Sequence, residues 1–288
     1  MRHAVALDIG GTKLAAARVD EDGRLGRRAR CETPVTTDPE VLWATVLDLL
    51  DEVREGDEVV AGVGCGGPMR PDGEAVSPLH IPAWRDFPLA ARVRDALGVA
   101  ALVDNDAKAL TLGEGWRGAA VGSPGYLGMV VSTGVGGGIV LDGRLLPGNA
   151  GHVGHVVVRP GGRTCRCGGR GCLEAEVSGV AIAERSGRPA EDAPLDLRVE
   201  SGTLVGRAVA SVCNLLDLRL AVIGGSVALG WGAPFFAAAQ AELDRLARLS
   251  FSRGARVVPA GLGADGPLVG AAAVGWTGIG ASMRAAPR

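Results

Sequence analysis

Short apolar runs alternate along the chain with longer stretches in which apolar side chains return every three or four residues. The runs predict buried strands, and the longer stretches predict helices with one buried face. Strands are expected over residues 4–9, 14–19, 24–31, 59–65, 99–103, 126–132, 139–146, 220–223 and 256–259. Helices are expected over residues 39–54, 89–97, 203–216, 234–249 and 268 to about 282, and another is expected to begin at Ala107. Strands that alternate with helices and end in glycine-rich turns predict an α/β fold.

The order of the predicted elements partly repeats. Residues 4–31 predict a strand, a glycine loop, a strand, a turn and a third strand, and residues 126–146 predict a similar series. This recurrence indicates a weak internal duplication. Residues 184–200 are polar and contain two prolines, so they predict a surface excursion.

Composition narrows the class of protein. The length of 288 residues suits two domains or one large domain, and a net charge of −2 argues against a nucleic-acid or acidic membrane surface as partner. Asp8 comes too early for a signal peptide, and no apolar run is long enough to cross a bilayer. Three of the six cysteines cluster and three are scattered, which is typical of metal binding in a reducing compartment. A cytoplasmic protein is expected.

The clustered cysteines follow a histidine at the spacing His155-x9-Cys165-x-Cys167-x4-Cys172. Imidazole nitrogen and thiolate sulfur are preferred zinc ligands, and four of them complete a tetrahedral structural site. The alternative is three buried thiols beside a loop histidine, but the arginines and glycines between the cysteines make this a polar loop. The spacing therefore predicts structural Zn²⁺.

Three glycine loops follow predicted strands, at residues 10–13, 133–138 and 224–226. Such loops let backbone N–H groups cradle phosphates, although turns also use glycine for geometry alone. None has the spacing of a Walker A or a Rossmann motif. Three together favour a nucleotide held between two lobes. Asp8, just before the first loop, is placed either to hold a metal-bound water or to form a turn at a strand end.

Asp104, Asn105 and Asp106 follow the predicted strand 99–103. Functional groups of α/β sheets gather at the carboxyl ends of strands. A carboxylate there can accept a hydroxyl proton during phosphoryl transfer, and a neighbouring amide can fix a sugar. Asp and Asn are also favoured helix N-caps, so spacing alone leaves both interpretations open.

The motifs together resemble the ROK proteins (repressors, open reading frames and kinases) of the actin-like sugar kinase superfamily. Residues 8–13 resemble the first phosphate motif, 104–107 the catalytic motif, 132–138 the second phosphate motif and 224–226 the adenosine-side motif. The cysteine cluster, which ends in the sequence 171–174, is similar to the family hallmark. The resemblance covers nearly the whole chain.

This resemblance implies an enzyme that uses ATP and Mg²⁺ to phosphorylate a hexose or an N-acetylhexosamine at the 6-hydroxyl. It implies Asp106 as the general base. The sugar contacts that it implies are Gly66, Gly67, Asn105, Asp106, His152, His155 and Glu174. The nucleotide contacts are Asp8, Gly10, Gly11, Thr12, Lys13, Thr133, Gly134, Gly136, Gly137, Gly224, Gly225 and Ser226. The zinc ligands are His155, Cys165, Cys167 and Cys172.

The resemblance also implies a two-lobed, ribonuclease H-like fold. The N-terminal lobe is expected over residues 1–115, with a C-terminal helix at about 268–288 packed back on it, and the second lobe over 116–267. A homodimer or higher homo-oligomer is expected. ROK repressors carry a DNA-binding domain before the first phosphate motif; only seven residues precede Asp8 here, so a sugar-sensing regulator is the less favoured alternative.

One position departs from the family pattern. The common motif is Glu-x-Gly-His, whereas this chain has His152-Val-Gly-His155. Imidazole lacks the two anionic acceptor oxygens of a carboxylate, so the hydroxyl pattern of ordinary glucokinases is in doubt. The variant resembles bacterial N-acetylmannosamine kinases, which makes N-acetylmannosamine the preferred substrate; glucose, another hexose or a cyclitol are the alternatives.

Overall fold

The computed structural model describes residues 1–281. The chain divides into two compact units, which are described separately. The first comprises residues 1–121 and the segment that begins at Leu262, and the second comprises residues 122–261. None of the helices within residues 1–281 is long and apolar enough to cross a membrane.

The first unit is built on a five-stranded sheet of order β3-β2-β1-β4-β5. Its strands are β1 (His3–Ile9), β2 (Lys13–Asp20), β3 (Leu25–Glu32), β4 (Glu58–Cys65) and β5 (Ala100–Asn105). β1, β2 and β3 form an antiparallel meander, whereas β1, β4 and β5 are parallel. Parallel strands require a crossover, and helices supply it after β4.

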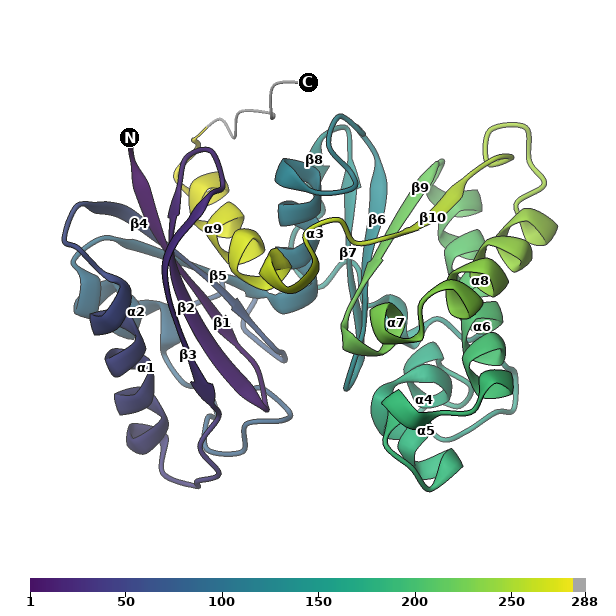
Figure 1. The fold of residues 1–288 in the computed structure, drawn as a ribbon, viewed down its shortest axis with the longest axis horizontal. Helices are drawn as coiled ribbons and strands as arrows, with labels where there is room; N and C mark the ends of the chain where they lie inside the picture. Colours follow the sequence, from purple (N-terminus) through teal and green to yellow (C-terminus); the bar gives the residue numbers. More distant parts are fainter. Residues whose placement is uncertain (282–288) are drawn as a thin grey trace. The chain divides into compact units, whose positions relative to one another are not determined.

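Helices cover both faces of this sheet (Figure 1). α1 (Pro39–Val53) and α2 (Leu89–Leu97) lie on one face, and α9 (Gly266–Gly278) lies on the other with α3 (Asp106–Arg117) packed against it. Side chains of β1 alternate accordingly: Val5 and Leu7 belong to the core beneath α1, and Ala4 and Ala6 to the core beneath α9.

The fit of α9 depends on small residues. A Cβ atom placed on Gly62 of β4 would lie 1.9 Å from the carbonyl oxygen of Ala271, so the helix backbone rests directly on the strand. Sequence periodicity predicts this helix from 268 to about 282, and the observed helix runs from Gly266 to Gly278. The predicted packing of residues 282–288 lies outside the described residues.

The second unit repeats the topology of the first. Its strands are β6 (Tyr126–Val131), β7 (Val135–Leu141), β8 (Arg144–Leu145), β9 (Leu220–Gly224) and β10 (Arg256–Pro259). Their order is β10-β9-β6-β7-β8, with a β6-β7-β8 antiparallel meander and β6, β9 and β10 parallel. Each strand of the first sheet thus has a counterpart in the second, which confirms the internal duplication. The α/β fold is confirmed as well.

Helices α6 (Leu195–Leu216) and α8 (Ala233–Leu246) pack against each other in the second unit. The prediction that this helix begins at residue 203 was wrong, because α6 begins eight residues earlier, directly after Pro194. Residues 184–200, predicted as a surface excursion, are mostly exposed or half-buried but include the first turns of α6. Its first two turns are amphipathic only weakly, and Glu200 within them pairs with arginines distant in sequence, Arg159 and Arg185. Such pairing is invisible to local periodicity.

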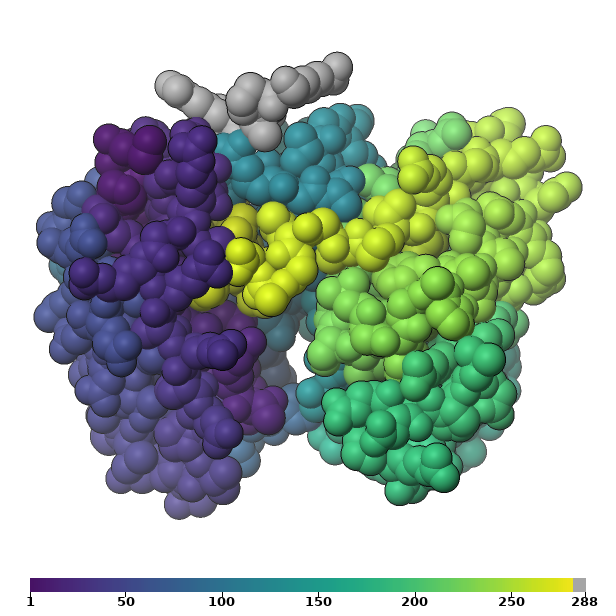
Figure 2. All heavy atoms as spheres, in the orientation of Figure 1, coloured from purple at the N-terminus to yellow at the C-terminus, as the bar shows by residue number. Residues whose placement is uncertain are grey.

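The second unit also contains five shorter elements. They are the 3₁₀ turns η1 (Val153–His155) and η2 (Ala190–Asp192), and helices α4 (Leu173–Val177), α5 (Gly179–Ser186) and α7 (Ser226–Trp231). Of these, η1 and α4 border the zinc-motif loop. The segment that contains α5, η2 and the start of α6 lies within the green region of the surface in Figure 2. The sequence analysis did not predict α4, α5 or α7, because five to eight residues are too few to show a helical period.

Candidate functional site

Three strand ends meet at one edge of the first sheet. Ile9 of β1 is paired with Cys65 of β4, and Cys65 is paired with Asn105 of β5. Because these strands are parallel, the segments that follow them emerge side by side at their carboxyl ends. The register therefore brings together the loop 10–12, the glycines 66–67 and the start of α3.

Asp106 and Asn105 sit where β5 changes into α3. Asn105 is the N-cap of the helix, and its side-chain oxygen accepts the N–H of Ala107 at 3.0 Å. The Asp106 carboxylate accepts the same N–H at 2.8 Å. The capping interpretation of Asn105 is confirmed, and the cap uses only the side-chain oxygen, so the NH₂ group is not engaged by it.

Asp8 is close enough to Asp106 for that carboxylate to influence its protonation. Burial raises the pKa of Asp106 above its ordinary range, although the residue keeps contact with solvent. The pKa of Asp8 is raised to about 7, first by burial and then by the charge of Asp106, while Lys13 opposes the shift. Burial is the main reason that the pKa of the Cys65 thiol is raised, and the charges of Asp106 and Asp8 raise it further. This edge of the sheet therefore holds an acidic pair that a cation would stabilise.

The first glycine loop is an open turn between β1 and β2. Gly10 donates its N–H to the carbonyl of Lys13 at 3.1 Å, and Thr33 donates its hydroxyl to the Gly10 carbonyl at 2.7 Å. Gly11, Thr12 and Lys13 are exposed. Thr33, which directly follows β3, thus holds the turn in place, while the central backbone of the turn remains accessible. A phosphate-binding loop requires such accessible backbone N–H groups.

The sequence analysis missed His80, which lies beside this loop. A Cβ atom on Gly11 would come within 2.4 Å of the Cβ of His80, so the two backbones are in contact. The charge of His80 also lowers the pKa of Asp106, against the larger effect of burial. The loop that carries His80 is held by Arg85, whose guanidinium donates to the carbonyls of Pro78 and Ile81 at 3.0 and 2.9 Å. No local motif marks this histidine.

The glycines after β4 lie at the same edge. A Cβ atom on Gly67 would be 3.8 Å from the side-chain nitrogen of Asn105, and one on Gly66 would meet nothing within 4 Å. The carbonyl of Gly67 accepts the N–H of Leu79 at 3.1 Å. The space above Gly66 and beside Asn105 is therefore open to a small polar ligand.

The second unit has the equivalent arrangement. Val130 of β6 is paired with Gly224 of β9, so the turn after β6 and the segment after β9 emerge together. The hydroxyls of Ser132 and Ser226 are 2.9 Å apart and join the two segments. Gly225 has φ +96°, and a Cβ atom there would lie 2.3 Å from the Val131 carbonyl oxygen. Only glycine allows this crossing.

A cavity of about 350 Å³ adjoins these two turns. Its wall combines the exposed backbone of the turns with the first residues of α5 and one face of α7. The lining residues are Thr133, Gly179, Val180, Ala183, Ala190, Glu191, Ser226, Val227, Gly230 and Trp231. The mixture of apolar and backbone polar groups, and the size, suit a small organic ligand.

The four glycine-loop residues predicted from the second phosphate motif do not share one environment. Thr133 is exposed and Gly134 lies in the turn, with a would-be Cβ atom 3.1 Å from the Glu174 carboxylate. Gly136 and Gly137 belong instead to β7. Gly137 is buried, and a Cβ atom there would lie 2.7 Å from Val153, so this glycine allows η1 to pack on the strand.

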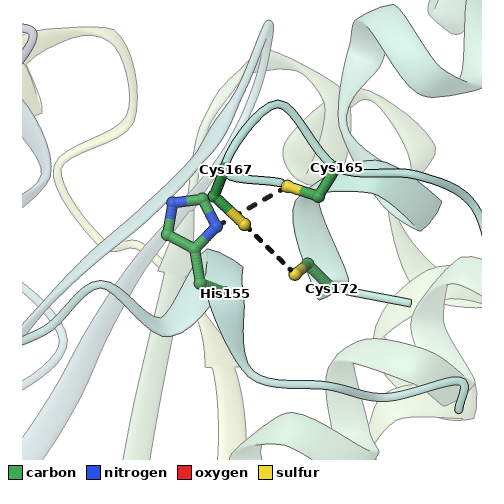
Figure 3. A group of neighbouring side chains, drawn as sticks. All are labelled: His155, Cys165, Cys167 and Cys172. Carbon is green, nitrogen blue, oxygen red and sulfur yellow. Dashed lines mark hydrogen bonds between the residues drawn. The ribbon is translucent and has the colours of Figure 1, made fainter. Parts of the chain in front are cut away.

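His155, Cys165, Cys167 and Cys172 converge (Figure 3). Their four donor atoms lie within 4.8 Å of one another. The Cys167 and Cys172 sulfurs are 3.7 Å apart, as are the Cys165 sulfur and the His155 Nδ1. Zn–S bonds of about 2.3 Å in a tetrahedron place sulfurs about 3.8 Å apart. The donor set and its spacing therefore fit Zn²⁺.

Glu174 links this cluster to the second glycine loop. It lies in the first turn of α4, two residues after Cys172, and its carboxylate accepts the N–H of Val135 at 3.0 Å. His152 precedes η1, and its ring centre is 6.2 Å from that of His155. Both imidazoles are exposed, and binding of a metal through Nδ1 of His155 would leave its Nε2 for another ligand.

Known proteins resemble this chain over most of its length. The model of the ROK family matches residues 4–276. The N-acetylmannosamine kinase of Citrobacter koseri is 36% identical over 246 residues, which cover 79% of this chain and 84% of that protein. The glucokinase of Thermotoga maritima is 36% identical over 183 residues, which cover 62% of this chain and 58% of that protein.

A solved structure matches at the level of the fold. A ROK family glucokinase from Streptomyces griseus, in complex with glucose and AMPPNP, has a TM-score of 0.82 and 28% sequence identity, and the match covers 96% of this chain and 99% of that one. The duplicated α/β fold is thus the one found in sugar kinases. The chain belongs to the ROK family.

Proposed function

We propose that this chain transfers the γ-phosphoryl group of ATP to the 6-hydroxyl of a hexose or N-acetylhexosamine, and that N-acetylmannosamine is its substrate. The observation that carries the proposal is the acidic pair at the carboxyl edge of the first sheet, where Asp106 has a raised pKa beside Asn105 and an open glycine segment. The kinship with N-acetylmannosamine kinases and glucokinases supports it.

Asp106 is the proposed general base. Its carboxylate would accept the proton of the 6-hydroxyl while that oxygen forms the new bond to phosphorus and the bond from phosphorus to the ADP oxygen breaks. A raised pKa makes a carboxylate a better proton acceptor near neutral pH, which suits this role. Asn105, whose side-chain NH₂ group is not used by the helix cap, would donate to a sugar oxygen, with Gly66 and Gly67 beside it.

The glycine loops are the proposed phosphate sites. Gly10, Gly11, Thr12 and Lys13 in the first unit, and Thr133 and Gly134 in the second, present accessible backbone N–H groups or a cation. The cavity beside Ser226 would hold the adenosine, with Gly224 and Gly225 shaping its floor. Asp8 would hold a water of the Mg²⁺ ion. That ion supplies charge neutralisation for the phosphates when it is bound.

The Cys₃His cluster is the proposed zinc site. Four protein ligands leave no open position for a substrate, so the metal would have a structural role. It would fix the orientation of His155 and the start of α4, and thereby Glu174. His155 through Nε2, His152 and Glu174 would then contact sugar hydroxyls. Because Glu174 also accepts the Val135 N–H, sugar recognition would be joined to the second phosphate loop.

His152 is the basis for choosing among sugars. Its neutral imidazole offers one donor and one acceptor where a carboxylate would offer two acceptors. A substrate with an N-acetyl group in place of one hydroxyl suits that change, because the amide presents a carbonyl acceptor and a single N–H. We therefore place N-acetylmannosamine before glucose.

A coupled ADP-release assay against a panel of sugars tests the proposal. N-acetylmannosamine, N-acetylglucosamine, glucose, mannose, allose and fructose are each offered with ATP and Mg²⁺. The highest kcat/KM is expected for N-acetylmannosamine, and His152→Glu is expected to shift preference toward glucose. Preference for glucose by the unmodified chain would reject the substrate assignment while keeping the sugar kinase, and no activity with any sugar would reject both.

A further inference from the structure

A hollow of about 410 Å³ lies at the zinc-motif loop, and none of the residues assigned above to sugar binding lines it. We call it the arginine hollow. It is lined by Arg159, Gly161, Gly162, Arg163, Arg170, Glu176 and Arg185. Four guanidinium groups and one carboxylate thus share one surface in a chain whose net charge is −2. Guanidinium groups this close together repel one another unless anionic groups lie beside them.

Carboxylates of the protein satisfy only part of that charge. The buried Glu176 carboxylate lies 3.3 Å from Arg159 and accepts the backbone N–H of Arg163 at 2.8 Å. Glu200 pairs with Arg159 and Arg185. Arg163 pairs with Glu184 at 2.8 Å, but the Glu184 side chain is 60% exposed, so this pair is weak.

Arg170 has no carboxylate partner among the described residues. Its only polar contact in residues 1–281 is with the hydroxyl of Thr164, at the long distance of 3.4 Å. A guanidinium group at the wall of a hollow, with its donors unused by carboxylates, is available to a ligand. Arg170 is exposed, so a ligand can reach it without unfolding the loop.

The chemistry of the lining selects the ligand. Guanidinium groups are planar forks of N–H donors that match phosphate and carboxylate oxygens in pairs. Several guanidinium groups around one space favour a group with multiple anionic oxygens, and a phosphate offers more of these than a carboxylate. The volume accommodates inorganic phosphate or a small phosphate ester.

From these observations we propose that the arginine hollow is an anion site that binds the phosphate group of a small molecule, distinct from the glycine loops. Arg170 is its principal uncommitted donor, and Arg163, Arg159 and Arg185 complete it. Arg163 and Arg170 flank the cysteine-bearing turn, whose two sides are joined by the β-bridge between Thr164 and Arg170 and by the hydrogen bond that Gly171 N–H donates to the Arg163 carbonyl. A ligand held there cross-links the two sides of the zinc-motif loop, so its binding stabilises that loop.

Calorimetric titration of the full zinc-loaded chain with inorganic phosphate, and separately with glucose 6-phosphate, tests the site. Arg170→Gln is the informative variant because its side chain is exposed and makes little contact, so the fold should be retained. Arg166→Gln is the matched control, since Arg166 is exposed in the same loop but does not line the hollow. If phosphate bound at the glycine loops instead, its affinity would be the same for the unmodified chain, Arg170→Gln and Arg166→Gln.

Arg170→Gln is expected to weaken phosphate binding about tenfold, the loss of one charge-assisted hydrogen bond, while Arg166→Gln leaves it unchanged. Tighter binding of glucose 6-phosphate with the same dependence on Arg170 would identify a phosphate ester as the ligand, and equal or weaker binding would identify free phosphate. Absence of binding to the unmodified chain, or equal affinity in all three proteins, would overturn the proposal.

Discussion

Asp8 and Asp106 show how position in a sheet changes the chemistry of an ordinary carboxyl group. Asp8 lies near the carboxyl end of β1, Asp106 directly follows β5, and β4 pairs with both strands. Burial and the charge of Asp106 therefore act together on Asp8. Asp106 is proposed to use its raised pKa in proton transfer, whereas Asp8 is proposed to act through a cation. The pair therefore costs folding free energy that ligand binding can recover.

The first prediction concerns the pH dependence that Asp8 imposes on stability. Its pKa in the folded chain is about 7 against an ordinary value of 3.8, so the folded state binds the proton more tightly. This contribution to stability is complete below pH 3.8, declines as pH rises toward 7, and is absent above 7. Asp8→Asn removes the ionisation, so its melting temperature relative to the unmodified chain should rise from pH 5 to pH 8.

Thermal melts without Mg²⁺ at pH 5, 6, 7 and 8 measure this difference. Asp48→Asn is the control, since Asp48 is exposed on α1, and it should follow the unmodified chain at every pH. Added Mg²⁺ should narrow the gap at pH 8 if it binds beside Asp8. A difference between Asp8→Asn and the unmodified chain that is constant over this range would contradict the assignment.

At the scale of elements, short helices and turns hold the functional groups in place through a few specific contacts. The zinc-motif loop positions α4, and Glu174 on α4 is bonded to Val135 at the start of β7. In the first unit, Glu114 of α3 is fully buried. Its carboxylate accepts the N–H of Ala119 at 2.7 Å and that of Leu262 at 3.0 Å. It thus fixes the two chain segments that connect the units.

Removal of zinc should loosen the loop. Cys167→Ser is expected to lose the metal and to lower the melting temperature, because metal affinity contributes directly to the stability of the loop it closes. Cys31→Ser is the control, since Cys31 lies on β3 away from the cluster and should keep one zinc per chain. Zinc content by mass spectrometry together with thermal melts measures both. Full zinc content in Cys167→Ser would reject the ligand set.

Glu114→Gln is predicted to destabilise the first unit. The substitution replaces one acceptor oxygen with an NH₂ group that faces a backbone N–H, and a buried unsatisfied donor costs about 1–3 kcal/mol. Urea unfolding measures the change. Glu32→Gln, at an exposed position of β3, should change the free energy of unfolding by less than about 0.5 kcal/mol. Equal stability of the two variants would show that Glu114 does not hold the connecting segments.

At the scale of the whole molecule, the duplication explains where the chemistry lies. In each unit a glycine turn joins the first two strands of the meander, and a glycine segment follows the next parallel strand. The first unit adds Asp106 after its fifth strand. The second unit adds the Cys₃His cluster between its meander and β9. One topology therefore supplies the two edges at which phosphate binding is proposed, and the additions distinguish them.

Much of this was predictable from the sequence because it is local. Apolar runs predicted strands such as residues 256–259, and glycine spacing marked the turns. Four residues of the types that bind zinc, within eighteen positions, indicated that their side chains converge. Contacts over long sequence separations were not predictable. The bond of Glu174 to Val135 and the contact of His80 with Gly11 depend on tertiary packing. In the early turns of α6, Glu200 likewise pairs with arginines distant in sequence, a contact that local periodicity does not show.

The central claim is that Asp106 is the general base of a sugar kinase, and the rate of ADP release by Asp106→Asn tests it most directly. The amide is nearly the same size as the carboxylate but cannot accept the hydroxyl proton. With the best sugar of the panel, kcat should fall about 10²- to 10⁴-fold, while melting temperature and ATP affinity stay close to those of the unmodified chain. A kcat that is retained within a few-fold would remove Asp106 from the mechanism.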